Sequence, residues 1–245
     1  MTKGWLRPAL FTLSPYHFVT LPLGGSPARY TVLMTVRTRA IREGTGAVDE
    51  AALLTYYGCT PDDWEEVADE RRFVEFIDER LMVHSPVGLA HQSIFDFVYR
   101  IMGACVERQA LGRVLAGPFV MELSYLRKFE PDIMFLLPAT AMRLADDRLV
   151  GAADLVIEIA SPSTRAYDSG EKREAYRVGG VRDYWMIDPA KRLVTLDRPA
   201  GHEIASTTVG VVRSETCIGF WLKAEWLWAD PLPTVEFCLA EILAS

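Results

Sequence analysis

Glu158 is the acidic residue that most needs a chemical explanation, because it lies inside the apolar run 155–160, LVIEIA. A short apolar run bounded by turn residues is typical of a strand buried on both faces. An ionised carboxylate there costs several kcal/mol unless it is paired, or its pKa shifts until it is neutral. The alternation of a strand puts Val156 and Ala160 on the same face as Glu158. We therefore expect a cationic partner on that face, which is a metal ion, a lysine or an arginine.

Asp132 is a second acid at the end of an apolar strand. Residues 130–132, Glu-Pro-Asp, lead directly into the apolar run 133–137. If the two strands are neighbours, Asp132 and Glu158 repel each other unless a divalent cation lies between them. Mg²⁺ prefers oxygen ligands of this kind and usually keeps several water molecules. The pair therefore predicts a magnesium site.

Lys172 and Tyr176 lie four residues apart in a segment that reads as a helix beginning at Asp168, with Glu171 completing an acidic capping box. This spacing places both side chains on one helix face. If the helix packs beside the Glu158 strand, Lys172 reaches the carboxylates, whereas Tyr176 is expected to pack. A metal ion polarises a phosphate and lowers the pKa of its bound water, and a lysine stabilises the developing charge. The set therefore suits phosphodiester cleavage.

The elements that must position these residues follow from hydrophobic periodicity. Apolar side chains three and four residues apart predict a long amphipathic helix over 88–110. Strands alternate with this helix and a shorter one, which predicts an α/β (α+β) domain with a mixed sheet flanked by helices. The other expected elements are a short helix at 49–57, a hairpin of 73–77 and 81–84, a strand at 114–123 broken at Gly117-Pro118, a strand at 184–187, antiparallel C-terminal strands from 192 onward and a closing helix at 235–243.

Composition limits the class of protein. The chain has 245 residues, of which 50% are hydrophobic, and its net charge is −7. This excludes disorder over most of the chain and argues against a protein that coats nucleic acid by bulk charge. Four prolines interrupt the uncharged stretch 8–28, so no membrane span is expected there. We expect an irregular N-terminal arm at 1–48, one domain at 49–245 and a cytoplasmic location.

The four cysteines are Cys59, Cys105, Cys217 and Cys238, and they lie far apart with no Cys-x-x-Cys pair. Their spacing fits neither a zinc ribbon nor a disulfide framework. We expect them to be small buried side chains in a reducing compartment.

Taken together, the motifs resemble the Uma-two family of restriction-endonuclease-like proteins, which belongs to the PD-(D/E)XK nuclease superfamily. The similarity extends from about Glu75 to Trp228, and its most specific part is 154–188. The resemblance implies a restriction-endonuclease-like core, Mg²⁺ dependence with Mn²⁺ as a substitute, and hydrolysis of DNA. The motifs are Glu-Pro-Asp at 130–132, Glu158 followed by IASPST, then Asp168, Lys172 and Tyr176, then YWMID at 184–188, and GFWL at 219–222.

Carried over by position, the resemblance makes Asp132 and Glu158 metal ligands and Lys172 the catalytic lysine. The superfamily's usual lysine position, two residues after the glutamate, holds Ala160 here, so the lysine would come from the following helix. No other cofactor is implied.

Two further residues enter the candidate site through the resemblance. Glu75 matches an upstream family glutamate that joins the metal site, and Glu79 stands where the family has glycine, which predicts a changed turn. His91 occupies a position at the start of the long helix where the family often has histidine, although it also continues the apolar stripe of that helix.

The favoured function is an Mg²⁺-dependent endodeoxyribonuclease that acts as a homodimer on DNA. One alternative is a non-catalytic nucleic-acid-binding or oligomeric scaffold that keeps the fold, which the acidic charge and Ala160 favour. Another is a metal-dependent hydrolase of small phosphate esters. A scaffold should bind DNA equally with Mg²⁺ or with a chelator and leave it uncut, and the small-ester hydrolase should show no affinity for DNA.

Overall fold

The structure is a computed structural model that describes residues 17–21, 30–34, 54–68, 73–84, 86–199 and 203–244. Its centre is a six-stranded sheet with the strand order β14-β13-β12-β11-β9-β6. β11 and β12 run parallel, and the other neighbours are antiparallel. The expected mixed sheet is therefore confirmed. Its strands are β6 (Arg113–Ala116), β9 (Ile133–Leu136), β11 (Leu155–Ile159), β12 (Asp183–Asp188), β13 (Leu193–Arg198) and β14 (Glu203–Thr207).

A second sheet has eight strands in the order β1-β2-β3-β5-β4-β8-β7-β10. The expected strand over 114–123 is broken at Gly117-Pro118, as predicted, and its two parts, β6 and β7, belong to different sheets. Helix α1 (Pro61–Val67) packs on this sheet through Trp64, whose indole donates a 2.8 Å hydrogen bond to the Val74 carbonyl. The strands are β1 (His17–Leu21), β2 (Tyr30–Met34), β3 (Leu54–Tyr57), β4 (Val74–Ile77), β5 (Arg80–Val83), β7 (Val120–Ser124), β8 (Arg127–Phe129) and β10 (Arg148–Val150).

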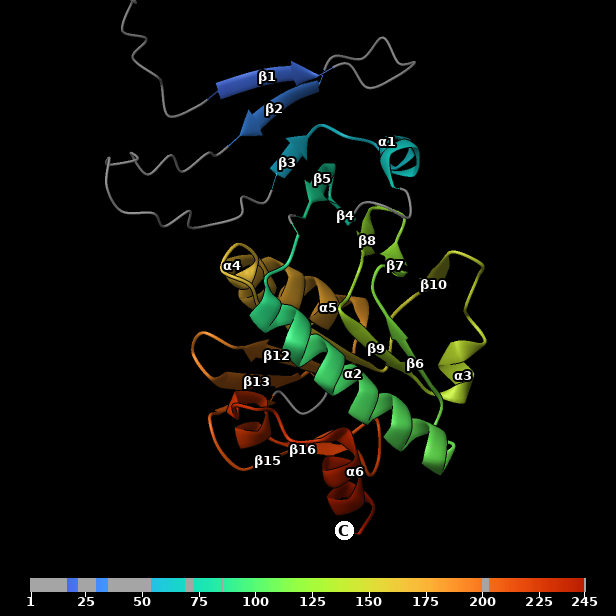
Figure 1. Ribbon diagram of the computed structural model, residues 1–245. Coiled ribbons are helices and arrows are strands. Elements are labelled where there is room, and N and C mark those ends of the chain that lie inside the picture. Colours follow the sequence, from blue (N-terminus) through green and yellow to red (C-terminus); the bar gives the residue numbers. More distant parts are fainter. Residues whose placement is uncertain are drawn as a thin grey trace, which may run out of the picture.

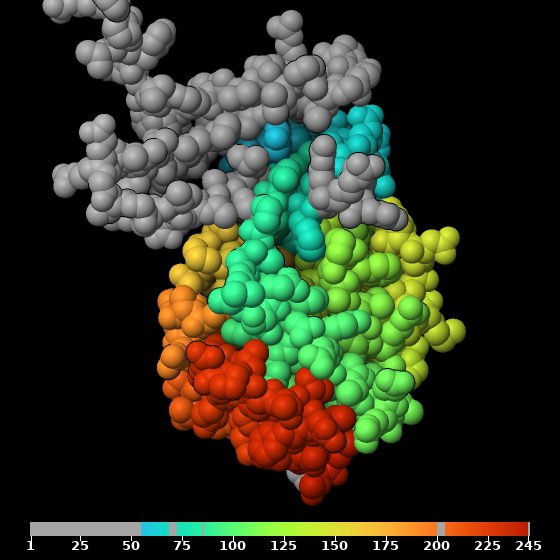
Figure 2. Space-filling model, viewed as in Figure 1, coloured from blue at the N-terminus to red at the C-terminus, as the bar shows by residue number. Residues whose placement is uncertain are grey.

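One face of the six-stranded sheet is covered by the long helix α2 (Leu89–Gln109), and the closing helix α6 (Val235–Leu243) packs against α2 and β16. Both helices lie close to their expected bounds. Figure 1 shows α2 lying across this sheet, and Figure 2 shows the C-terminal part of the chain, in red, packed against α2, in green. The remaining elements on this side are the two-stranded sheet of β15 (Val211–Arg213) and β16 (Trp221–Lys223) and the turn η3 (Ala224–Trp228).

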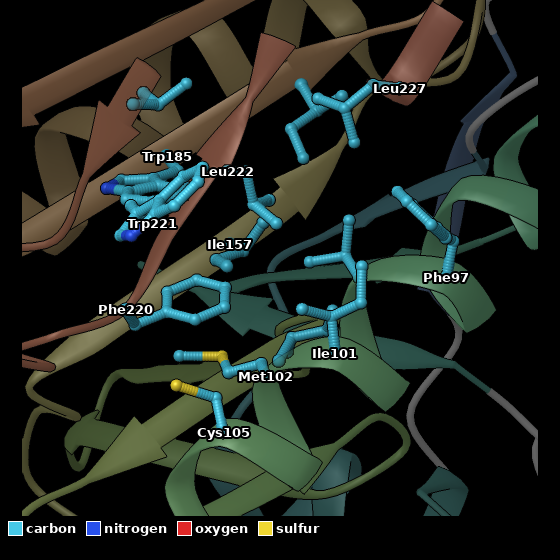
Figure 3. Packing of buried hydrophobic residues seen from close by; sticks show 14 of the residues in the cluster. Phe97, Ile101, Met102, Cys105, Ile157, Trp185, Phe220, Trp221, Leu222 and Leu227 are labelled. Atoms are coloured by element: carbon cyan, nitrogen blue, oxygen red, sulfur yellow. The ribbon is translucent and has the colours of Figure 1, made fainter. Parts of the chain in front are cut away.

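The main hydrophobic core lies between α2 and the six-stranded sheet. Ile101 and Cys105 of α2 belong to the same buried cluster as Ile157 of β11 and Trp185 of β12 (Figure 3). Val156 and Ala160 belong to a second cluster on the opposite face of the sheet. The alternation expected for β11 is therefore confirmed, and Glu158 lies on the face away from α2.

The helical segment after β11 differs from its expected form. It consists of α4 (Arg165–Tyr167), the π-helical turn η1 (Asp168–Lys172) and α5 (Arg173–Gly179), and it ends at Gly180 with a left-handed φ of 95°. The expectation that Asp168 caps this helix is wrong, because helical structure begins three residues earlier. The turn before it is closed by Ser161 and Thr164, each of whose backbone N–H groups donates to the hydroxyl of the other.

The expected helix at 49–57 is also wrong over its described part. Residues 54–57 form β3, which pairs antiparallel with β5. Thr55, Tyr56 and Tyr57 are β-branched or aromatic, and such side chains favour a half-buried strand. Residues 49–53 lie outside the described residues.

Several other sequence-based expectations concern short segments. β4 and β5 form the expected hairpin, and its two-residue turn places Asp78 and Glu79 at positive φ values of 43° and 65°. Of the arm expected at 1–48, the structure describes β1 and β2, which pair antiparallel; the division at residue 48 stays a prediction. Short helix α3 (Pro138–Ala141) follows β9.

The four cysteines are free and buried, as expected. In the described part of the chain, no helix combines the length and the apolar character needed to cross a membrane.

We predict that Ile157→Ala lowers the free energy of unfolding by about 2–5 kcal/mol, because it opens a cavity in the central strand. Ile157 is fully buried, whereas Ile204 of β14 is 62% exposed, so Ile204→Ala is the matched control and should cost less than about 1 kcal/mol. Denaturant unfolding measures both. Equal losses would contradict the placement of β11 at the centre of the core.

Candidate active site

Glu158 is held in the interior by two donors from the helical segment that follows its strand. Its Oε1 accepts a 2.6 Å hydrogen bond from the Tyr176 hydroxyl and lies 2.8 Å from the Lys172 ammonium. Glu158 is 3% exposed and Lys172 is 2% exposed. Of the three partners left open by the sequence, a lysine is therefore the one that the structure provides. Tyr176 also packs edge-on against Phe129, so it both packs and fixes the carboxylate.

Lys172 is the last residue of the π-helical turn η1. Its ammonium contacts two carboxylates at equal distance, because Glu75 Oε1 also lies 2.8 Å from Nζ. Glu75 belongs to β4 of the eight-stranded sheet and Glu158 to β11 of the six-stranded sheet. The lysine therefore joins the two sheets through one buried group.

Glu75 is fully buried, and four donors satisfy its two oxygens. Lys172 Nζ and the Glu130 backbone N–H contact Oε1. The Tyr167 hydroxyl donates to Oε2 at 2.9 Å, and His84 Nε2 lies 3.1 Å from the same oxygen. Burial alone would raise the pKa of Glu75, but Lys172 and His84 outweigh it and hold the pKa well below its ordinary value. Glu75 is thus an ionised anchor for the lysine.

Asp132 lies immediately before β9, which is the antiparallel neighbour of β11. Its Oδ2 accepts a 2.7 Å hydrogen bond from the Ile159 N–H and lies 3.2 Å from His91 Nε2. The Asp132 N–H in turn points to Glu158 Oε2 at 3.4 Å. The two acids of the motif therefore lie side by side on adjacent strands, as the sequence predicts. The Asp132 side chain is 19% exposed, so it remains accessible from solvent.

A cavity of about 920 Å³ lies next to these acids. Asp132, Glu158, Asp168 and Lys172 all contribute to its lining, so the structure brings the three predicted catalytic residues to one place. His91 also lines it, and its contact with Asp132 gives it a place beside the acids. Glu75 and Tyr176 are not part of the lining and hold the lining residues from behind.

Three residues near the centre were not selected from the sequence. Asp168 is buried in the lining, Glu130 is buried beside Glu75, and Tyr167 donates to Glu75. Asp168 was assigned to a helix cap because the capping signal and a buried acid look the same in sequence. Glu130 is the first acid of the Glu-Pro-Asp motif at 130–132, and its place in that motif is the sequence signal that could have found it.

The site contains more buried acidic groups than its lysine can keep ionised. The pKa of Glu158 is raised to about 8, chiefly by burial, and the charges of Asp132 and Asp168 add to this while Lys172 only partly offsets it. Burial also raises the pKa of Asp168 to about 6, against the effect of Lys172. Burial and the charge of Glu75 raise the pKa of Glu130 to about 8. The carboxylates on the cavity side therefore lack a counter-charge.

Two polar atoms in this region are buried with no hydrogen-bond partner, namely Glu130 Oε2 and His91 Nδ1. Both residues line the cavity. Within the described ranges, no three or more His, Cys, Asp and Glu side chains form a ready-made metal site. A zinc site would need such a set, whereas Mg²⁺ is commonly held by one or two carboxylates together with water and substrate oxygens. The pair Asp132 and Glu158 therefore fits Mg²⁺.

The sequence matches a known protein family. The sequence model of the Uma2 family, described as "Putative restriction endonuclease", matches residues 61–225. The chain belongs to the Uma2 family. The match covers β4, β9, β11 and the helical segment of Lys172, so every element of the site lies inside the Uma2 region.

A solved structure supports the Uma2 fold. The crystal structure of a "putative nuclease belonging to DUF820" from Anabaena variabilis ATCC 29413 is similar to this chain with a TM-score of 0.62. The two are 18% identical, and the similarity covers 69% of this chain and 97% of that one. At this identity the likeness establishes the nuclease-like mixed α/β fold alone. No curated protein matched this chain.

We predict that Glu158→Gln changes the pH dependence of stability in the metal-free protein. The pKa of Glu158 is raised from 4.5 to about 8, so its contribution to stability is complete below pH 4.5 and is lost as the pH rises through 8. Glutamine carries no charge and keeps an oxygen for Tyr176 and Lys172. The variant should therefore melt above the wild type at pH 9, by about 2–4 °C for each kcal/mol gained.

The measurement is the melting temperature in EDTA between pH 5 and pH 9. The advantage of the variant should shrink toward pH 5, where the wild-type side chain is protonated. A variant that melts lower than the wild type at pH 9 would show that ionised Glu158 stabilises the fold.

Proposed function

We propose that this protein is an Mg²⁺-dependent endonuclease that hydrolyses phosphodiester bonds in DNA. The observation that supports this most directly is the charge balance of the site. Glu75, Glu158 and Asp168 act on a single lysine, and Asp132 lies beside Glu158. Burial raises the pKa values of Glu158 and Asp168 by more than that lysine offsets. A divalent cation on the cavity side supplies the charge that the protein lacks there.

Asp132 and Glu158 would hold the cation, with Mn²⁺ as a substitute for Mg²⁺. When bound, the ion polarises the phosphodiester and lowers the pKa of its water. The protein fixes both ligands from behind. Tyr176 orients the Glu158 carboxylate, and the Ile159 N–H and His91 orient Asp132.

Lys172 would stabilise negative charge on the phosphate. An ammonium group has three N–H donors, and contacts with Glu75 and Glu158 account for two of them. We assign the third to a phosphate oxygen in the cavity that Lys172 lines. A fixed charge in a buried site is effective because little reorganisation is needed as the transition state forms.

Glu75 would act as a positioning residue for Lys172. The resemblance suggested that it joins the metal site, but its four contacts are all with donors from the protein, and the side chain is fully buried. A carboxylate whose two oxygens are satisfied in this way would have to lose these contacts in order to bind a cation. Its role is to keep the ammonium charged and in place.

DNA as the substrate is supported by the description of the Uma2 family. A homodimer would place two sites on the two strands of a duplex, and four buried free thiols suit the reducing cytoplasm. The chief alternative is a non-catalytic scaffold, favoured by Ala160 in the usual lysine position. Lys172 weakens that argument, because the following helix delivers an ammonium to the same carboxylate.

We predict that Glu158→Gln and Asp132→Asn each reduce Mg²⁺-dependent plasmid cleavage by at least about 100-fold and abolish Mg²⁺ binding. Glu174→Gln is the matched control, because Glu174 lies on the same helical segment as Lys172 but pairs with Arg177 on the surface. Supercoiled-plasmid cleavage and calorimetric titration of Mg²⁺ measure the two effects. Undiminished Mg²⁺ affinity in both variants would remove these acids from the metal site.

We predict that Glu75→Gln separates metal binding from turnover. Loss of the Glu75 charge weakens the positioning of Lys172, so kcat should fall about tenfold or more. Mg²⁺ affinity should stay within about twofold of the wild type, because Glu75 does not contact the cation. Lys172→Met should show the same pattern more strongly. A parallel loss of Mg²⁺ affinity in Glu75→Gln would instead place Glu75 among the ligands.

A further inference from the structure

The cavity has an apolar wall that phosphate chemistry does not explain. Phe73, Val83, Pro86, Val87 and Phe95 line the same space as the carboxylates. Phe73 is 41% exposed and Val87 is 47% exposed, so this wall is open to solvent. The volume of about 920 Å³ lies at the upper end of the roughly 300–1,000 Å³ typical of ligand sites. The space is therefore larger than a phosphodiester group needs.

The aromatic surface continues along α2 out of the cavity. The rings of Phe95 and Tyr99 are parallel, with an interplanar angle of 3° and centroids 5.9 Å apart. Phe95 lines the cavity and Tyr99 is 37% exposed on the next turn of the helix. The pair extends the apolar surface of the cavity wall along α2.

The third part of the lining carries hydroxyl groups. Ser161, Ser163 and Thr164 form a cluster after β11, with Ser161 Oγ 2.9 Å from Ser163 Oγ and 3.1 Å from Thr164 Oγ1. All three line the cavity. Lys172 and the carboxylates proposed to hold a cation, the hydroxyls, and an apolar aromatic wall thus enclose one space, and they suit the phosphate, the sugar and the base of a nucleotide in that order.

The charge of the cavity lining also supports a site that binds a nucleotide base. Of the described residues that line it, Lys172 alone is a lysine or arginine, and it is buried between two glutamates. Proteins that bind duplex DNA through its backbone place several lysines and arginines on the phosphates. Binding at this site must therefore draw on another interaction, and stacking of bases on aromatic rings is the one that the wall offers.

We infer that the cavity receives one complete nucleotide, whose base leaves the stack of the DNA and stacks on Phe95 instead. The substrate class is then DNA that is single-stranded or locally unpaired at the scissile phosphate. This inference rests on the proposed nuclease function, because it places the phosphate of that nucleotide at Asp132, Glu158 and Lys172.

The test measures binding without turnover. The full chain carrying Glu158→Gln is titrated in EDTA, by fluorescence anisotropy, against three DNAs of one sequence: a single strand, a duplex, and a duplex with one unpaired nucleotide. The single strand and the interrupted duplex should bind about tenfold more tightly than the intact duplex. Adding Phe95→Ala should remove that preference and leave duplex binding unchanged.

Two further variants exclude a folding effect. Phe95→Leu keeps an apolar side chain of similar size without a ring face, and it should lose most of the preference while melting close to the parent. Phe237→Ala removes a 52% exposed aromatic ring on α6, away from the cavity, and should change nothing. Equal affinity for all three DNAs, or an unchanged preference in both Phe95 variants, would overturn the inference.

The nuclease proposal and this inference fail in different ways. If the wild-type protein cuts intact duplex as fast as unpaired DNA, the nuclease function stands and the nucleotide pocket is rejected. A protein that cuts no DNA but shows the Phe95-dependent preference keeps the pocket and rejects the hydrolysis.

Discussion

The contact of one lysine with two buried glutamates determines the geometry of the rest of the site. Lys172 lies 2.8 Å from Glu75 and 2.8 Å from Glu158, which come from different sheets. Burying such groups contributes little net stability, because desolvation offsets most of the attraction. Their value here is positional, since the ammonium can satisfy both carboxylates only when the two sheets and the helical segment take up one arrangement. Each sheet then delivers its acids to a common cavity.

Both glutamates contact the lysine, and their other neighbours explain why they differ in pKa. Glu75 receives four donors, and its pKa is held below the ordinary range. Glu158 shares the lysine but faces Asp132 and Asp168, and its pKa is raised to about 8. One positive charge cannot neutralise both sides. The additional donors from His84, Tyr167 and the Glu130 N–H go to Glu75, so the cavity-side acids are the ones that benefit from an added cation.

Much of the candidate site could be predicted from the sequence, because the positions of its residues depend on local sequence patterns. The alternation in 155–160 placed Glu158 on the correct face, and the Glu-Pro-Asp motif placed Asp132 beside it. The four-residue spacing of Lys172 and Tyr176 put both side chains on the helix face that meets Glu158, and both contact its carboxylate. What failed required long-range information. Asp168 carries the signature of a helix cap, and it is buried because its segment packs on the six-stranded sheet, where the Tyr184 hydroxyl donates to the Asp168 carbonyl.

Helix α2 shows how one element can serve both the core and the site. Its Ile94, Val98 and Ile101 face the six-stranded sheet, while His91 and Phe95 line the cavity. Since Ile94 and Val98 are buried, the rotation of the helix about its axis is fixed by core packing. The positions of the imidazole beside Asp132 and of the Phe95 ring follow from that rotation. Core packing thus determines how the apolar wall and the carboxylates face each other across one cavity.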